Sequence, residues 1–371
     1  MAVISFKCPN CDGELVFHPT NQKYKCEYCF SEFTQEELDS MEPAQGEERI
    51  QQQESAQEST EFVEHTETGG SAQSSEHRQS QEEAVAYHCP SCGAEIVTDG
   101  TTAATFCYYC HNPVVLSGRV SGEFLPHKII PFSIDKEEAI KKFLKYVQSK
   151  KFIPKAFFNK NQIDKISGVY FPYWMIDMDY DGQLQAEGKN VRVWRSGETE
   201  YTETKIYRVE REGAIHLEDI TRNALQKANS KLSEGVLPYD VSQVKAFNMG
   251  FLSGFLAERR DIEQKELENS VQEEAKEYGE QILHNTITGY SSVLVKNCNL
   301  NEKKENWDYI MLPVWTVTYK GKNGTMYYYS MNGQNGKVYG ELPLDYKKVW
   351  GLGSIISIVV LILGLIGGFF L

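Results

Sequence analysis

Four C-x-x-C pairs constrain the fold of this chain more than any other feature of its sequence. They form two sets, and in each set 14 residues separate the two pairs. A C-x-x-C turn aims two thiolates at one point, and a hairpin between two such turns gathers four thiolates around one tetrahedral metal ion. The sequence therefore predicts two zinc ribbons, each closed around a structural Zn²⁺. The predicted ligands are Cys8, Cys11, Cys26 and Cys29 in the first ribbon and Cys89, Cys92, Cys107 and Cys110 in the second.

Zinc is the favoured interpretation among several for these cysteines. The opening residues, MAVISFKC, lack the apolar run of a secretory signal, so we expect a reducing compartment rather than disulfides. Two weaker interpretations are a redox-active C-x-x-C pair and an iron site. Three histidines lie near the cysteines and are either replacement ligands or, as we favour, residues outside the metal site: His18, His88 and His111.

Charge is distributed unevenly along the chain. The net charge is −14, and residues 41–86 alone hold 11 acidic and 2 basic residues, which is −9. Residues 36–86 are rich in Glu, Gln, Ser and Thr, so we predict a disordered acidic linker between ribbon 1 (1–35) and ribbon 2 (87–119). An acidic chain of this kind argues against a protein that binds nucleic acid mainly through its phosphates.

The C-terminal segment 350–371 contains no charged residue. As a helix it would extend about 33 Å, enough to cross a hydrocarbon core of about 30 Å. Lys347 and Lys348 precede it, so the positive-inside rule predicts a single-pass protein of the cell membrane whose N-terminal bulk lies in the cytoplasm. Gly364 and Gly368 form a G-x-x-x-G pattern that could pair two such helices in a homo- or hetero-oligomer.

Residues 120–346 are predicted to form a mixed α+β body. We expect a strand at 129–132, a helix capped by Asp135, strands at 191–193 and 205–211, helices at 218–232 and 257–285, and a β meander over 312–339. A further strand pair is predicted over 168–185, turning at Asp181-Gly182. Pro172-Tyr-Trp174 and Pro313-Val-Trp315 resemble each other, which indicates either a duplicated subdomain or two strands that each begin with proline.

Few residues of the body suggest chemistry. Asp177, Asp179 and Asp181 have the spacing of a calcium loop, but the twelfth position is Gly188 instead of Glu, so we favour a strand and turn. Cys298 is expected to be a small buried apolar residue rather than a nucleophile. No phosphate-binding glycine loop, nucleophile elbow or H-E-x-x-H motif occurs, and no catalytic residue is predicted.

The chain resembles a family of membrane-anchored zinc-ribbon proteins of Gram-positive bacteria, often described as transcription-factor-IIB-type zinc ribbon-containing. The matching segments are CPNCDGEL…CEYC, CPSCGAEI…CYYC, SGVYFPYWMID, FLSGFLAERRDIE and MLPVWTVTY…NGQNGKVYGELP, together with the apolar C-terminus. The resemblance implies that the eight ribbon cysteines bind zinc. It also implies a gene neighbourhood with phage-shock protein A and SPFH (flotillin-like) proteins, and hence a membrane platform for such cytosolic partners.

The expected function is a membrane-anchored scaffold that recruits cytosolic envelope-stress proteins, with no enzymatic activity. One alternative is a membrane-tethered protein that binds nucleic acid through its ribbons. A second alternative is an enzyme or transporter accessory with its site in the body, 120–346.

Overall fold

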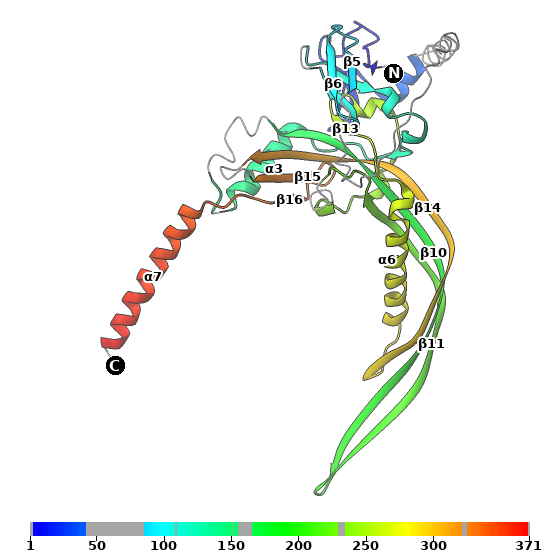
Figure 1. Ribbon diagram of the computed structural model, residues 1–371, viewed down its shortest axis with the longest axis vertical. Helices are drawn as coiled ribbons and strands as arrows, with labels where there is room; N and C mark the ends of the chain where they lie inside the picture. Colours follow the sequence, from blue (N-terminus) through cyan, green and yellow to red (C-terminus); the bar gives the residue numbers. More distant parts are fainter. Residues whose placement is uncertain are drawn as a thin grey trace, which may run out of the picture. The chain divides into compact units, whose positions relative to one another are not determined.

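The computed structural model describes residues 3–41, 85–107, 110–150, 152–154, 165–228, 234–320 and 325–369. It confirms a mixed α+β chain and separates it into two compact units (Figure 1). Unit 1 comprises Met1–Arg119 and Asn248–Ala257, and unit 2 comprises Val120–Phe247 and Glu258–Leu371. Both cysteine ribbons therefore belong to one unit, together with a short segment from the middle of the predicted body.

Unit 1 is built from short strands. The first ribbon contains β2 (Leu15–His18), β3 (Lys23–Cys26) and β4 (Glu32–Phe33) in one sheet, followed by α1 (Gln35–Met41). The second ribbon pairs β5 (Val85–His88) with β6 (Glu95–Thr98), and β7 (Thr102–Phe106) with β8 (Pro113–Leu116). β1 (Val3–Ile4) joins β8, and the 3-10 helices η1 (Ser117–Arg119) and η5 (Met249–Leu252) complete the unit. α1 and β5 extend into both ends of the predicted linker, whose residues 42–84 lie outside the described ranges.

Unit 2 is organised around two long antiparallel strands, β10 (Ser167–Ser196) and β14 (Ser292–Lys320). β11 (Thr199–Asn223) pairs with β10, and β15 (Met326–Asn332) and β16 (Val338–Gly340) continue the sheet beyond β14. β9 (Lys128–Ile129) lies parallel to β14, and β12 (Lys245–Ala246) pairs with β9. The remaining elements are η2 (Gly122–Phe124), α3 (Lys136–Gln148), η4 (Val241–Gln243), α6 (Gln264–Asn285) and α7 (Tyr346–Phe369), while β13 (Leu256–Glu258) contains the unit boundary.

The helix α6 packs its small and apolar residues against the long strands (Figure 1). It begins at a capping box in which Glu263 and Glu266 satisfy each other's backbone N–H groups, so it starts at Gln264 and not at Ala257 as predicted. Its buried residues are Val271, Ala275, Gly279 and Leu283. Tyr278 and Ile282 of the same helix are exposed.

Two further expectations for the body are wrong. The strand pair does not turn at Asp181-Gly182, because β10 continues to Ser196 and turns at Gly197, where φ is 64°. Gly182 lies within the sheet opposite Gly213, and the side chains of Leu283, Ile215 and Leu300 occupy the space above it. The helix expected at 218–232 is also wrong, since β11 stays paired with β10 up to Asn223. Long-range pairing there outweighs local helix propensity.

The two Pro-x-Trp segments occupy equivalent places in the sheet. Pro172 of β10 lies opposite Met311 of β14, and Pro313 of β14 lies opposite Tyr170 of β10. One twofold rotation between the two strands therefore exchanges the two prolines. The hydrogen bonds next to them repeat as well, because Ala224 N donates to Pro172 O (3.0 Å) and Gly333 N donates to Pro313 O (2.8 Å).

The same rotation relates the segments that lead into α3 and α6. Ile262 N donates to Ala224 O at 3.2 Å, and Ile134 N donates to Gly333 O at 3.0 Å. Trp174 Nε1 donates to Ile262 O and Trp315 Nε1 donates to Ile134 O, both at 3.0 Å. The tryptophan of each half thus fixes the start of the other half's helix. These matched contacts favour the duplicated subdomain over two unrelated proline-initiated strands.

Candidate metal centre

The eight cysteines form two compact sulfur clusters, as their spacing predicts. In the first cluster Cys8 Sγ lies 3.6 Å from Cys29 Sγ, and Cys11 Sγ lies 3.5 Å from Cys26 Sγ. In the second cluster the corresponding pairs, Cys89–Cys110 and Cys92–Cys107, are both 3.7 Å apart. A tetrahedron of sulfurs at about 2.3 Å from a zinc ion has edges of about 3.8 Å, so the two clusters have the size of a four-thiolate zinc site. Each cluster can hold one metal ion.

All four C-x-x-C turns share one backbone pattern. The N–H of the first cysteine donates to the carbonyl five residues later, and its own carbonyl accepts from the N–H four residues later, as in Cys8 N→Gly13 O and Asp12 N→Cys8 O. The fourth residue after that cysteine has a positive φ in every turn: Asp12 (58°), Phe30 (61°), Gly93 (73°) and His111 (60°). Because only Gly93 of these four is a glycine, residue type alone did not reveal this shared geometry.

Local hydrogen bonds give the thiols of the first cluster different acidities. The Ser31 hydroxyl lies 3.2 Å from Cys29 Sγ, and hydrogen bonds with Ser31 lower the pKa of Cys29 to about 6. For Cys11 the backbone bond to Gly13 lowers the pKa, but the bonds to Cys29 and Cys26 outweigh it and raise the pKa to about 12. Metal binding must therefore displace protons from thiols whose pKa is raised, such as that of Cys11.

One buried carboxylate connects the two ribbons. Glu14 is 4% exposed, and its Oε1 accepts from Ser91 Oγ at 2.6 Å, Asn112 Nδ2 at 3.2 Å and Lys7 Nζ at 2.7 Å. Lys7 belongs to the first ribbon, whereas Ser91 and Asn112 flank cysteines of the second. The clusters are thus packed into one unit, whereas the predicted linker alone would allow independent ribbons.

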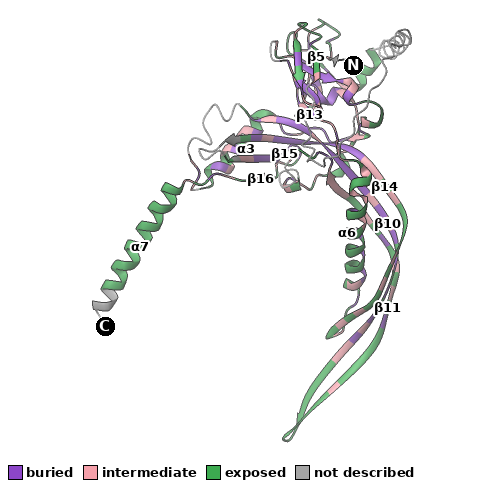
Figure 2. Cartoon of the chain, in the orientation of Figure 1, coloured by how far each residue is buried: buried purple, intermediate pink, exposed green. Residues whose placement is uncertain are grey.

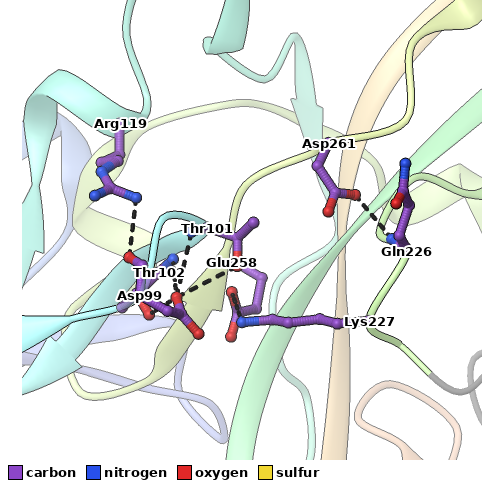
Figure 3. Close-up of polar contacts among 8 residues, drawn as sticks. All are labelled: Asp99, Thr101, Thr102, Arg119, Gln226, Lys227, Glu258 and Asp261. Atoms are coloured by element: carbon purple, nitrogen blue, oxygen red, sulfur yellow. Dashed lines mark hydrogen bonds and ion pairs between the residues drawn. The ribbon is translucent and has the colours of Figure 1, made fainter. Parts of the chain in front are cut away.

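The loop between β6 and β7, which connects the two turns of the second cluster, begins at an aspartate (Figure 3). Asp99 Oδ1 accepts from the backbone N–H of Thr102 at 2.9 Å and from its hydroxyl at 2.6 Å. Arg119 is buried, and it donates to the backbone oxygen of Asp99 at 3.0 Å and to Tyr87 Oη at 2.8 Å. These contacts fix the loop that returns the second pair of cysteines to the first.

A segment far along the sequence completes the first ribbon. Phe251 packs edge-on against Phe17, with ring centroids 5.1 Å apart, and Ser253 Oγ donates to Leu15 O at 2.6 Å. Gly254 has a φ of 90° and lies so close to Val16 that a Cβ atom would be 2.4 Å from that side chain. The predicted ribbon 1–35 is therefore supported by residues 248–257, which the local cysteine motif does not indicate.

The other candidate residues lie outside the two clusters. Neither four-cysteine group includes His18, His88 or His111, and His18 Nδ1 contacts Thr20 Oγ1 at 2.9 Å instead. Cys298 lies in the interior of β14 opposite Leu184, partly buried, and burial raises its pKa.

The three aspartates of the calcium-like pattern lie along β10, each with its own partner in unit 2. Asp177 Oδ1 accepts from Asp219 N at 3.0 Å, and Asp179 Oδ1 lies 2.7 Å from His216 Nδ1. Asp181 forms an ion pair with Lys303 at 2.9 Å.

The same unit contains Gln226 and Lys227, which contact Asp261 and Glu258 respectively (Figure 3).

Comparison with known proteins gives one informative relative. Descriptions of known protein families give no match, and no solved structure matches the chain. A protein of Bacillus subtilis (strain 168), described as "Uncharacterized protein YdjG", is 30% identical over 314 residues. The alignment covers 71% of this chain and 92% of the relative. At this identity and coverage, the chain belongs to the same protein family as YdjG.

Proposed function

We propose that this protein is a membrane-anchored adapter whose two zinc ribbons form a docking surface for cytosolic proteins. The main support for the proposal is that each cluster consists of four cysteine sulfurs, which complete the coordination of one metal ion. A zinc ion with four thiolates keeps no position for water or substrate, so it stabilises a fold rather than performing chemistry. Zinc is the metal that this donor set and geometry favour.

Exposed aromatic side chains supply a contact surface beside the first cluster. Tyr28 and Phe30 flank the ligand Cys29 and are 69% and 71% exposed. Lys25 Nζ lies 6.0 Å from the centre of the Phe30 ring. Exposed aromatic residues next to a rigid turn are typical of protein contact surfaces. We therefore assign the docking face to this side of ribbon 1.

The apolar helix α7 is the proposed membrane anchor. Its segment Tyr346–Leu365 has a mean hydropathy of 2.1, and none of it is buried against the rest of the protein (Figure 2). It is long and apolar enough to cross a bilayer once. Lys347 and Lys348 at its start favour a cytoplasmic position for both ribbons.

The partners follow from the family resemblance and from the ribbon surface. Proteins resembling phage-shock protein A, or SPFH-domain proteins, are the proposed partners at a stressed envelope. In this proposal zinc stabilises the fold of the ribbons, the ribbons bind the partner, and α7 keeps the complex at the membrane.

A crosslinked pull-down from membranes tests the proposal. Full-length protein is compared with a Tyr28→Ser/Phe30→Asn variant, in which Asn suits the positive φ of position 30. A Tyr278→Ser/Ile282→Ser variant removes two exposed apolar side chains of α6 and serves as the matched control. Zinc content is measured on all three proteins.

We expect about two zinc ions per chain in every variant, as four-thiolate sites require. We also expect loss of the stress-protein partner only in the ribbon variant. Equal partner recovery in all three proteins would move the docking function away from the ribbons. Recovery of nucleic acid in place of protein would replace the adapter with the nucleic-acid alternative.

A further inference from the structure

The hairpin formed by β10 and β11 continues beyond the rest of its sheet. β14 accompanies β10 only as far as the pair Lys189–Ser292, whereas β10 and β11 stay paired up to Ser196–Thr199. Residues 190–205 thus form a two-stranded ribbon, and Figure 2 shows this end of the hairpin as largely exposed. A two-stranded hairpin in water has only marginal stability, and an additional strand would stabilise it.

The outer edge of β11 has no neighbouring strand among the described residues, because β11 pairs only with β10. Large apolar side chains are exposed on both faces of this end. On one face Trp194 stacks on Tyr201, with ring centroids 5.6 Å apart and planes 12° apart. On the other face Val193 is 55% exposed and Ile206 is 61% exposed. An edge strand with these properties is a template for another strand.

We propose that the β11 edges of two copies of this chain pair antiparallel, on a twofold axis that passes through Thr204. In this register each β11 residue before position 204 in one copy lies opposite the residue equally far after position 204 in the other copy. Glu203 then faces Lys205 of the second copy, and Glu200 faces Arg208. Tyr201 faces Tyr207, and Thr202 faces Ile206. Between Thr199 and Val209 no two like charges are opposed, and opposite charges and aromatic pairs across strands are stabilising.

Neighbouring registers lack this complementarity. Moving the axis to position 203 places Glu203 opposite itself, and moving it to position 205 places Lys205 opposite itself. Residues 190–196 of β10, which β14 does not accompany, are less suited to pair with a second copy of themselves, because they include Arg192 and Arg195 but no acidic residue. In the single chain Lys205 and Glu203 form only an exposed ion pair along the strand, at 3.6 Å. Such a pair contributes little, so both groups remain available for cross-strand contacts.

Pairing of this kind would form a four-stranded sheet from two hairpins. Tyr207 of each copy would extend the Trp194–Tyr201 stack of the other, so that aromatic rings cross the new sheet on one face. Ile206 of each copy would join Val193 of the other on the opposite face, across the intervening Thr202. Exposed apolar side chains would be covered on both faces by a second copy of the same chain.

A disulfide at the axis tests the proposal in full-length, zinc-loaded protein in detergent micelles. In a Thr204→Cys variant the two introduced cysteines lie directly opposite each other, with Cβ atoms about 4.5–5.5 Å apart, close to disulfide distance. Thr202→Cys is the matched control, since it has the same face and residue type. Its two introduced cysteines would lie four residues apart along the strands, about 14 Å, beyond the reach of a disulfide.

We expect mild oxidation to crosslink the Thr204→Cys variant into a dimer and to leave the Thr202→Cys variant uncrosslinked. Adding Lys205→Glu to the Thr204→Cys variant should abolish the crosslink, because Glu203 would then face a second glutamate. Adding Glu203→Lys to that protein should restore the crosslink, because reversing both charges renews the complementarity.

Four results would overturn the proposal. The first is the absence of a crosslink in the Thr204→Cys variant, and the second is equal crosslinking at positions 202 and 204. The third is a crosslinked dimer that does not respond to the charge changes. The fourth is binding of the hairpin end to lipid vesicles by a monomer.

Discussion

At the scale of single residues, Glu14 has the most consequential contacts in unit 1. It connects both ribbons through three donors to one oxygen, while its Oε2 is buried and has no hydrogen-bond partner among the described residues. We expect Glu14→Ala to lower the free energy of unfolding of the zinc-loaded protein by about 1–3 kcal/mol, since buried donors lose their acceptor. Denaturant titration measures this loss. Glu32→Ala, which removes an exposed contact with Asn21, should change the stability by less than about 0.5 kcal/mol.

A residue-scale prediction for pH concerns Asp308. Burial alone would raise its pKa, but the hydrogen bond and charge of Lys128, 2.6 Å away, outweigh burial and hold the pKa below its usual 3.8. A lowered folded-state pKa stabilises the protein above the unfolded value, and this contribution disappears as the pH falls through the folded value. Asp308→Asn should therefore cost about 1 kcal/mol near pH 7 and progressively less below about pH 4.

Asp219 provides the opposite case for the same titration. Burial and the neighbouring Asp177 and Glu218 raise its pKa, so its ionised form is disfavoured in the folded protein. Asp219→Asn should leave the stability unchanged or increased at neutral pH, and asparagine tolerates the φ of 61° at this position. The free energies of unfolding of the Asp308→Asn and Asp219→Asn variants are measured across pH 3–7. A loss of stability in both variants at neutral pH would contradict the opposite pKa directions assigned to these two aspartates.

At the scale of elements, the two glycines that face each other in β10 and β11 should respond differently to a side chain. A Cβ at Gly182 would lie 2.8 Å from Leu283 and 2.9 Å from both Ile215 and Leu300, whereas a Cβ at Gly213 would have no atom of the described residues within 4 Å apart from its chain neighbours. Gly182→Val should cost about 1–3 kcal/mol through crowding, and Gly213→Val should be neutral or stabilising. Thermal unfolding of both variants measures the difference, and equal effects would mean that α6 does not pack over Gly182.

The elements also show what could be predicted from sequence. The cysteine spacing predicted both clusters, because two C-x-x-C pairs separated in this way can bring four thiolates to one metal ion. The helix cap at Asp135 was also predicted, and it is confirmed by the bond that the Asp135 side chain accepts from Glu138 N. The extent of β10 and β11 was missed because their pairing depends on partners far apart in sequence. Residues 248–257 were assigned to the body because nothing local indicates that Phe251 packs on Phe17.

At the scale of the whole molecule, metal removal should unfold unit 1 and leave unit 2 folded. Unit 1 contains two short ribbons, 1–35 and 87–119, each built around a thiolate cluster, and chains below about 40 residues usually need a metal or disulfides to fold. Unit 2 has its own core of long strands and α6. We expect a zinc chelator under reducing conditions to abolish amide protection in residues 3–41 and 85–119, and to leave protection in β10 and β14. Simultaneous loss of protection in both units would contradict this independence.

The most direct test of the adapter is recruitment of its partner to a membrane. Full-length protein is reconstituted in vesicles, and a purified protein resembling phage-shock protein A is added before the vesicles are sedimented. We predict that the partner sediments with zinc-loaded vesicles, and that it stays in solution after zinc removal or with the Tyr28→Ser/Phe30→Asn variant. Equal sedimentation with loaded, zinc-free and variant vesicles would contradict a docking role for the ribbons.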